Sequence, residues 1–520
     1  MDVHRLEAQR RENRDAIAAL GLPPYGERAN DLITLADAAR QYDERADERQ
    51  KELAKAAKEG EGDADFDDPR PVVRIAGRAM LHRDNGKLVW INLRDHTGDL
   101  QIAVSKRDCD ELGFNLAKVS DLGDVLIAEG PLVKTRTGEI TVWASSLRSG
   151  VKSLAPPPEK WSGLADPEIR YRKRYIDLYT NPEVMRTFML RSQIIARVRR
   201  FWDERAFLEV ETPVLQPQPG GAAARPFWSH LNALDMPVVM RIATELHLKR
   251  LLVGGMPRVY EIGRIFRNEG VDRQHNPEFT SIEVYEAFGD CWSMLDHTEA
   301  LLRELAHFIA VTTADPDVES EDIAIDQVKL PWGDSSIDYG SPFARFTYSE
   351  LFEKALGFPL TDTARAREEA KKRGLKHEGL DDVFIINELF EEVAEPIIDP
   401  TKPTFVTEYP APISPLTRPL PDNPNLAGRW DLFIGGMEIG TAYTELNDPD
   451  VQIAKFQEQL TGADEEEQAF RTMDEDFIEA LKVGMPPAGG LGLGIDRIVM
   501  LMTNNRSIRD VILFPFMRPA

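Results

Sequence analysis

Short β-strands at close, regular spacing between Val72 and Leu147 constrain the fold of this 520-residue chain more than any other feature. Turn-forming sequences such as Asp84-Asn85-Gly86 and Thr137-Gly138 separate them. About five short strands in about 75 residues are typical of a small closed barrel, and an OB-fold fits this pattern. The apolar alternation predicts the strands Val72–Met80, Leu88–Asp95, Leu100–Val104, Val125–Lys134 and Glu139–Leu147.

Barrels of this kind often bind single-stranded nucleic acid. Trp90 would supply a stacking ring, and Gln101 and Glu139 would supply hydrogen-bonding side chains. Judged by composition alone, each of the three is more simply explained as an ordinary strand residue.

Helices and a proline run flank the barrel region. Residues 1–20 and 34–58 are predicted helices, and an acidic linker runs from Gly60 to Pro71. Pro156-Pro157-Pro158 marks the next boundary. We therefore expect an N-terminal helical extension at 1–70, an OB-fold domain at 71–155 and one large α+β domain at 156–520.

Composition limits the class of protein. Asp and Glu outnumber Lys and Arg by 88 to 63, which argues against a simple basic nucleic-acid coat protein. Only Cys109 and Cys291 occur, so no disulfide framework or Cys-based zinc site is expected. No apolar run approaches the roughly 18 residues of a membrane span. We also find no secretory signal, so a cytoplasmic location without membrane contact is expected.

The first candidate site lies where strand Val259–Phe266 leads into a loop and strand Phe279–Glu286 leads out. Alternation puts Phe279, Ser281, Glu283 and Tyr285 on one face of the second strand, below Arg267 and Glu269 on the loop. An arginine at such a place can bind carboxylate and phosphate oxygens. A surface ion-pair network is the alternative.

The second candidate site is a hairpin closed at Gly435-Gly436. This turn predicts that Phe433 pairs with Glu438 and Asp431 with Gly440, so Asp431 and Glu438 become diagonal neighbours on one face. Two carboxylates so placed can share a Mg²⁺ that also binds phosphates. Two exposed acids on a hairpin are the alternative.

The third candidate site is a strand in which glycine alternates with Leu491, Leu493 and Ile495. One face is apolar and the other is bare backbone at Gly490, Gly492 and Gly494, on which a flat ligand can lie. Close strand packing is the default explanation for one such segment. A NAD site is disfavoured because no acid completes the dinucleotide motif.

In this order the segments resemble the three motifs of class II aminoacyl-tRNA synthetases: Leu208–Pro213, then Phe266-Arg267-Asn268-Glu269 with Pro277–Phe279, then Gly492–Arg497. Within that class the chain is similar to the lysyl-tRNA synthetases, from about residue 5 to residue 519. The stretches Pro219–Pro226, Glu245–Arg250, Thr444–Asp448 and Arg509–Pro515 carry this likeness.

The resemblance implies an ATP-dependent ligase that forms lysyl-adenylate and then lysyl-tRNA(Lys), as a homodimer built through Arg186–Pro213. It implies Mg²⁺ as cofactor, about two to three ions per active site. The roles implied are Gly221 and Glu245 for the α-amino group of L-lysine; Tyr285 and Glu445 for its ε-ammonium; Thr441 and Tyr443 beside the substrate; Arg267 and Arg497 as catalytic and ATP-binding residues; Glu269, His275, Asn276 and Phe279 for ATP; Asp431 and Glu438 for Mg²⁺; and Trp90, Gln101 and Glu139 for the anticodon.

Some residues depart from the family pattern. Thr441 stands where Asn is usual, Asp431 where Glu is commoner, and Arg273-Gln274 change the order before His275. An aspartyl- or asparaginyl-type synthetase is the nearest rival, but Glu445 has the wrong charge for an acidic substrate. A catalytically inactive RNA-binding paralogue is the other rival, although Arg267, Glu438 and Arg497 are all present.

The implied roles conflict with strict strand alternation. Glu438 and Glu445 would then lie on opposite faces, yet both are assigned to one site. We therefore expect the alternation to break between Ile439 and Ala442, with a bulge at Gly440.

Overall fold

The computed structural model describes residues 3–59, 66–158, 164, 166–222, 224–315, 323–461 and 474–519. It divides into two compact units, Met1–Arg186 and Thr187–Ala520. This division falls after the boundary expected at residue 156. The first half of the linker predicted from Gly60 to Pro71 lies outside the described residues.

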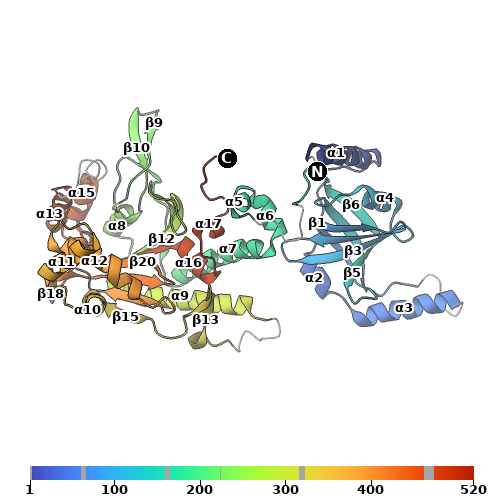
Figure 1. Cartoon of the computed structure of the whole chain (residues 1–520). Helices are drawn as coiled ribbons and strands as arrows, with labels where there is room; N and C mark the ends of the chain where they lie inside the picture. Colours follow the sequence, from blue (N-terminus) through green and yellow to red (C-terminus); the bar gives the residue numbers. More distant parts are fainter. Residues whose placement is uncertain are drawn as a thin grey trace. The chain divides into compact units, whose positions relative to one another are not determined.

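Unit 1 contains the predicted barrel. The strand order is β1-β2-β3-β5-β4-β6, and an additional pairing of β1 with β4 closes five strands into a ring (Figure 1). Val73, Ile75, Val89 and Ile91 alternate inward and fill the barrel. The strands are β1 Val72–Asp84, β2 Leu88–Arg94, β3 Asp99–Ser105, β4 Val125–Lys134, β5 Ile140–Ala144 and β6 Ser146–Val151.

Two sequence predictions in unit 1 need correction. The strand expected over Glu139–Leu147 ends at Ala144, because β5 pairs with β3 whereas the following β6 pairs with β4 alone. The helix expected over 34–58 is two helices, α2 Leu35–Arg40 and α3 Glu44–Glu59. The carboxylate of Asp43 accepts hydrogen bonds from the backbone N–H groups of Arg45 and Ala46, which starts the new helix. A further helix, α4 Glu111–Val119, was not expected.

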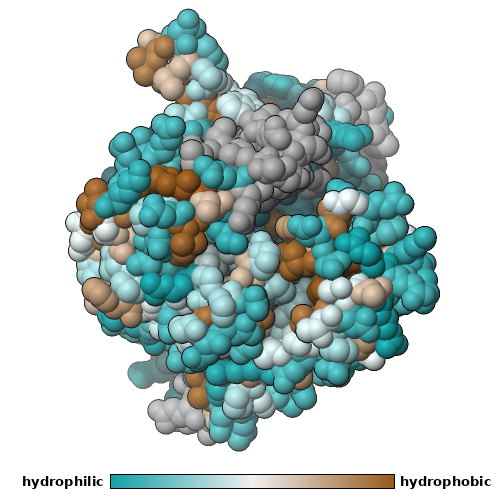
Figure 2. Space-filling view, turned by 90° about the vertical axis from the view of Figure 1, so that its left-hand side faces the viewer, coloured by the Kyte–Doolittle hydropathy of each residue, from teal (hydrophilic) through white to brown (hydrophobic). Residues whose placement is uncertain are grey.

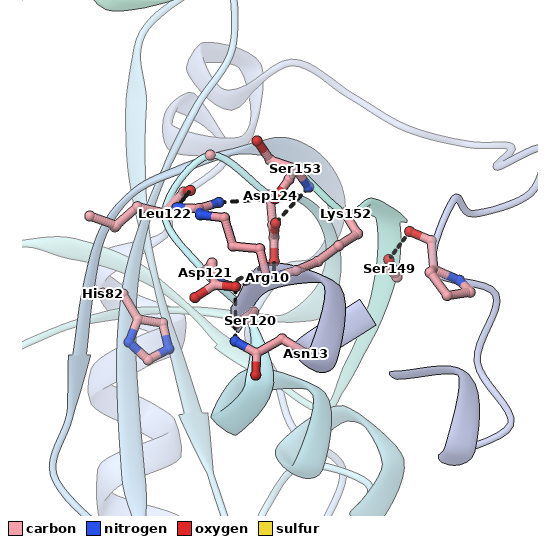
Figure 3. A network of polar contacts seen from close by, with 12 residues as sticks. Arg10, Asn13, His82, Ser120, Asp121, Leu122, Asp124, Ser149, Lys152 and Ser153 are labelled. Atoms are coloured by element: carbon pink, nitrogen blue, oxygen red, sulfur yellow. Dashed lines mark hydrogen bonds and ion pairs between the residues drawn. The ribbon is translucent and has the colours of Figure 1, made fainter. Parts of the chain in front are cut away.

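A buried polar network attaches α1 (Val3–Ala19) to the barrel (Figure 3). Arg10 donates to the carbonyl oxygens of Ser153 (3.0 Å) and Leu122 (2.9 Å). The ammonium of Lys152 contacts the carboxylates of Asp121 and Asp124, and Lys152 is almost fully buried. A buried ammonium needs such partners, so this network fixes the N-terminal helix to the fold.

Unit 2 is built on one eight-stranded sheet, as the predicted α+β fold requires. The six central strands are antiparallel, and the outermost strand at each edge, β15 and β7, pairs in parallel. The order across the sheet is β15 Ala344–Thr347, β16 Thr404–Thr407, β19 Arg429–Ile434, β20 Met437–Thr444, β21 Ala488–Gly494, β12 Glu278–Ala287, β11 Arg258–Phe266 and β7 Leu208–Glu209.

Helices cover the apolar face of this sheet. Helix α9 (Cys291–Thr313) contacts β19, β20 and β21, and α16 (Ile495–Met502) contacts β12 and β21. Their apolar residues form one core with Ile282, Leu491 and Leu493. The long helix expected over Arg186–Phe207 is α7, Pro182–Asp203. Because the core occupies one face, the opposite face of the central strands is left for polar side chains.

The remaining helices and strands complete the two units. Helix α8 (Glu245–Val253) contacts β11, β12 and α15. The others are α5 Pro167–Arg172, α6 Arg174–Thr180, β8 Leu215–Gln216, β9 Trp228–Leu231, β10 Met236–Met240, η2 Ile325–Gln327, β13 Lys329–Trp332, β14 Ser335–Asp338, α10 Tyr348–Leu356, α11 Thr363–Arg373, α12 Asp382–Leu389, η3 Phe390–Ala394, η4 Glu395–Ile397, η5 Ala411–Ile413, β17 Pro419–Leu420, β18 Asn423–Ala427, α13 Pro449–Thr461, α15 Glu475–Gly484 and α17 Ile508–Val511.

The surface is dominated by hydrophilic residues on the face in Figure 2, where apolar residues form separate patches. No helix among the described residues combines the length and apolarity that crossing a membrane requires.

Candidate active site

A glycine-lined strand forms the floor of a site on the polar face of unit 2. In β21, Gly492 lies between Glu283 of β12 and Thr441 of β20, and Gly490 lies between Tyr285 and Tyr443 of the same two strands. The glycines leave backbone exposed between two rows of functional side chains. The register therefore brings together the three segments singled out in the sequence.

The hairpin of β19 and β20 has the predicted turn but a different register. Gly435 and Gly436 both have positive φ (64° and 76°), as a two-residue hairpin turn requires. Phe433 pairs with Glu438 as predicted, but Asp431 pairs with Thr441 and not with Gly440. Gly440 pairs instead with Leu432, which leaves Ile439 as an extra residue.

This bulge is the predicted break in alternation, and its extra residue is Ile439, immediately before Gly440. Beyond it, Thr441 and Tyr443 lie on the same face as Glu438. A side chain at position 440 would collide with the Gly492 backbone and the Leu493 side chain. The glycine is therefore required by the close approach of β21.

One end of the site is a pocket lined by acids. Glu245 opens α8 and Glu445 follows β20, and both are buried. Lys249 lies between them with its Nζ 2.6 Å from Glu245 Oε1 and 2.5 Å from Glu445 Oε2. Gly221, with φ of 83°, lies beside Glu245, since a Cβ there would be 3.2 Å from that residue's Cβ.

Glu445 also has an oxygen aimed at the floor. Its Oε1 is buried without a hydrogen-bond partner, and it occupies the space that a side chain at Gly490 would need. Burial raises the pKa of Glu445 to about 8, Lys249 opposes this, and Glu245 adds to it. A buried carboxylate oxygen without a partner is a place for a cationic donor.

Tyr285 and Glu283 line the same pocket from β12. The Tyr285 hydroxyl donates to Glu283 Oε2 at 3.4 Å, and the Thr244 backbone N–H donates to Glu283 Oε1 at 3.0 Å. Burial raises the pKa of Glu283 to about 7 despite the Thr244 hydrogen bond. Burial also raises the pKa of Tyr443, to about 12. The phenols therefore stay neutral at pH 7.

Arg267 and Phe279 lie next to this pocket. The Arg267 guanidinium is 5.4 Å from the centre of the Phe279 ring, a cation–π distance. Glu269 accepts a weak hydrogen bond from the Arg225 backbone at 3.4 Å. Asn276 is buried, donates to the Glu278 carbonyl at 2.6 Å and has an unpartnered Oδ1.

Arg497 begins the helix after the glycine strand and reaches two other segments. Its guanidinium donates to the Glu438 carbonyl oxygen and lies 3.1 Å from His275 Nε2. The other ring nitrogen of His275 is 2.8 Å from Asp272 Oδ2. Arg267, Arg497 and His275 thus surround one side of the glycine floor.

The two carboxylates proposed for metal differ in their surroundings. Arg429 donates to both oxygens of Asp431 (3.0 and 2.6 Å), and the Thr441 hydroxyl donates to Oδ1 at 2.6 Å. The carboxylate of Glu438 has no hydrogen-bond or ion-pair partner among the described residues. Desolvation by its neighbours and then repulsion from Asp431 raise the pKa of Glu438, although the residue keeps exposed surface.

These residues fit a divalent cation bound jointly with a ligand's oxygens. A cation would relieve the repulsion on Glu438, and one lone pair of Asp431 remains after Arg429 and Thr441 are counted. Mg²⁺ is usually held by one or two carboxylates plus phosphate oxygens. No group of three or more His, Cys, Asp or Glu arranged to hold a metal occurs within the described ranges.

The barrel of unit 1 has a separate groove of 1090 Å³. Trp90 and Trp143 line it edge to face, with ring centres 6.3 Å apart. Gln101 also lines it but is buried and accepts from Thr141 at 3.1 Å, whereas Glu139 is exposed. Six basic and four acidic residues border the groove, so its lining carries an excess of basic residues although the whole chain has an excess of acidic ones.

Sequence reasoning gave no role to Lys249, Arg429 and Trp143, and it placed Glu283 on the site face without assigning it a ligand. Lys249 could have been noticed from its i, i+4 spacing with Glu245. Glu283 shares the strand face of Tyr285, and Arg429 shares that of Asp431. The alternation that places Trp143 on a barrel strand does not show that it lies beside Trp90.

Comparisons with known proteins cover both units of the chain. The model of the class II tRNA synthetases (D, K and N) matches residues 166–518, and that of the OB-fold nucleic acid binding domain matches residues 73–149. A lysine–tRNA ligase of Carboxydothermus hydrogenoformans is 46% identical over 86% of this chain and 89% of its own length. Lysine–tRNA ligases of Pelotomaculum thermopropionicum (47%) and Cronobacter sakazakii (46%) match over 86% of this chain and 87% and 86% of theirs.

Proposed function

The chain belongs to the class II lysine–tRNA ligases, and we propose that it uses the glycine-floored site of unit 2 to activate L-lysine with ATP. Members of this family are aminoacyl-tRNA synthetases, so the enzyme is an ATP-dependent ligase that joins lysine to tRNA. A cytoplasmic location is part of the proposal, since its relatives work in translation.

The proposed reaction has two steps. The lysine carboxylate attacks the α-phosphorus of ATP, giving lysyl-adenylate and pyrophosphate. The 3′-terminal ribose hydroxyl of tRNA(Lys) then takes the lysyl group and releases AMP. Neither step needs a covalent nucleophile from the enzyme, because positioning and charge stabilisation dominate phosphoryl transfer.

We assign separate residues to lysine and to ATP. Arg267 would hold the lysine carboxylate and the α-phosphate, and Phe279 would stack under adenine beside it. Arg497 would bind the γ-phosphate, with His275, Glu269 and Asn276 around the nucleotide. The bare backbone of the glycine strand lets these flat groups lie close.

Mg²⁺ is the expected cofactor, and Glu438 with Asp431 would hold it. When bound, it would neutralise phosphate charge and act as a Lewis acid on phosphoryl oxygens. Arg267 and Arg497 supply further positive charge on the same side of the floor.

The unpartnered Oε1 of Glu445 carries the assignment of lysine over aspartate or asparagine. A fully buried carboxylate oxygen favours a cationic side chain and repels an acidic one. Glu245 and Gly221 would receive the α-amino group, with Tyr285, Tyr443 and Thr441 bordering the aliphatic chain.

ATP–pyrophosphate exchange with each of the twenty amino acids tests this function. We expect exchange with lysine alone among them at micromolar to millimolar concentrations. Exchange driven by aspartate or asparagine would refute the substrate, and none with any amino acid would favour an inactive RNA-binding paralogue.

A further inference from the structure

The side-chain ammonium of Lys249 lies inside the pocket lined by Glu245 and Glu445, which we assign to the substrate lysine. None of its surface is exposed, and both of its ion-pair partners, Glu245 and Glu445, are residues that we assign to the substrate. Glu245 is one helical turn away on α8, whereas Glu445 comes from the segment after β20. Only the tertiary structure brings Glu445 to the local pair of Glu245 and Lys249.

Lys249 leaves part of each carboxylate available. It contacts Oε1 of Glu245 and Oε2 of Glu445, while Oε1 of Glu445 has no partner among the described residues. A carboxylate bound through one oxygen is fixed in orientation but can still accept hydrogen bonds at the other. The contact therefore turns Glu445 Oε1 toward Gly490 and Tyr285.

Lys249 also sets the charge of the pocket. Besides Lys249, the titratable groups facing Glu445 are the acids Glu245 and Glu283 and the phenol of Tyr285, and Arg267 acts on Glu283. Burial lowers the pKa of Lys249, but Glu245 and Glu445 outweigh this and raise it. Without this cation, the two neighbouring acids, Glu245 and Glu283, would oppose the ionisation of Glu445 unchecked.

We propose that Lys249 is a specificity-determining residue that positions Glu445 and favours its charged form for the ammonium of the substrate. It touches no reacting atom, so it acts as a positioning residue. The inference rests on the proposed function of Glu445.

The test is pyrophosphate exchange by full-length Lys249→Met between pH 6.5 and 9. At pH 7 we expect the KM for lysine to rise about 10- to 100-fold, which corresponds to the loss of one charged hydrogen bond. The KM for ATP should stay within about twofold, because Lys249 lies away from the nucleotide groups. The deficit should shrink as the pH rises toward 9, since loss of the cation raises the pKa of Glu445 further and a higher pH restores part of its ionisation.

Lys152→Met is the matched control. Lys152 is another almost fully buried lysine with two carboxylate partners, Asp121 and Asp124, in the barrel (Figure 3). It should lower the melting temperature without changing the KM for lysine or its pH profile. An unchanged KM in Lys249→Met, or an equal loss at every pH, would overturn the inference.

A double variant tests the same inference if Lys249→Met does not fold. Lys249→Met/Glu445→Gln removes both charges of one ion pair, which is tolerated better than removing one. We expect its KM for lysine to equal that of Glu445→Gln alone; a further loss of tenfold or more would contradict the inference. Absence of lysine-dependent exchange in the unmodified enzyme would instead refute the proposed function itself.

Discussion

At the scale of single residues, two glutamates on one hairpin are expected to serve different ligands. Glu445→Gln keeps the shape but loses the charge, so it should weaken lysine by about 1.5–3 kcal/mol and leave ATP nearly unchanged. Glu438→Gln should instead weaken Mg²⁺-ATP and leave lysine nearly unchanged, because its unpartnered carboxylate faces Asp431. Isothermal titration of each ligand measures both effects. Equal losses for both ligands in either variant would contradict the division of roles.

At the scale of elements, strand β21 supports a graded glycine-to-alanine series. A Cβ at Gly490 would collide with Glu445 Oε1 and Tyr285, so Gly490→Ala should lower the melting temperature and abolish lysine binding. At Gly492 the nearest atom is 3.9 Å away, so Gly492→Ala should stay folded but project a methyl onto the floor and raise the KM values. Circular dichroism melting and pyrophosphate exchange separate the two effects. Normal kinetics in both variants would exclude the strand as a substrate floor.

The barrel, as a second element, should act on tRNA alone. Trp90→Ala removes a stacking surface worth roughly 1–3 kcal/mol per base. We expect a higher KM for tRNA with pyrophosphate exchange nearly unchanged, and Trp143→Ala should behave alike because the two rings line one groove. Aminoacylation kinetics with varied tRNA measure this. Equal damage to activation and transfer would refute a separate role for the barrel.

At the scale of the whole molecule, we predict a homodimer through Arg186–Pro213 and the neighbouring strands. Leu208, Val214 and Leu215 are 51, 39 and 53% exposed in this region, an apolar surface that a partner could bury. Leu215→Glu should shift sedimentation at micromolar concentration toward monomer. Val483→Glu is the matched control, since Val483 is 78% exposed on α15. A monomeric unmodified protein would contradict the prediction.

The sequence by itself determined the features that depend on near neighbours. The strands of the barrel, the Gly435-Gly436 turn and the faces of β12 and β21 follow from a backbone period of two and from turn stereochemistry. Even the bulge beside Gly440 was predictable, because the family resemblance assigns Glu438 and Glu445 to one site. Helix bounds were less predictable: the capping carboxylate of Asp43 divides α2 from α3 within one charged run.

Only the tertiary structure decided which distant side chains meet. The pairing of Asp431 with Thr441 depends on where the bulge lies, and the contact of Trp90 with Trp143 depends on how the barrel closes. The Lys249 ammonium meets Glu445 because α8 packs on β12 while β20 and β12 flank the same glycine strand. Spacing along the chain carries no information on such contacts, since they follow from strand order and from the burial of charge in a shared pocket.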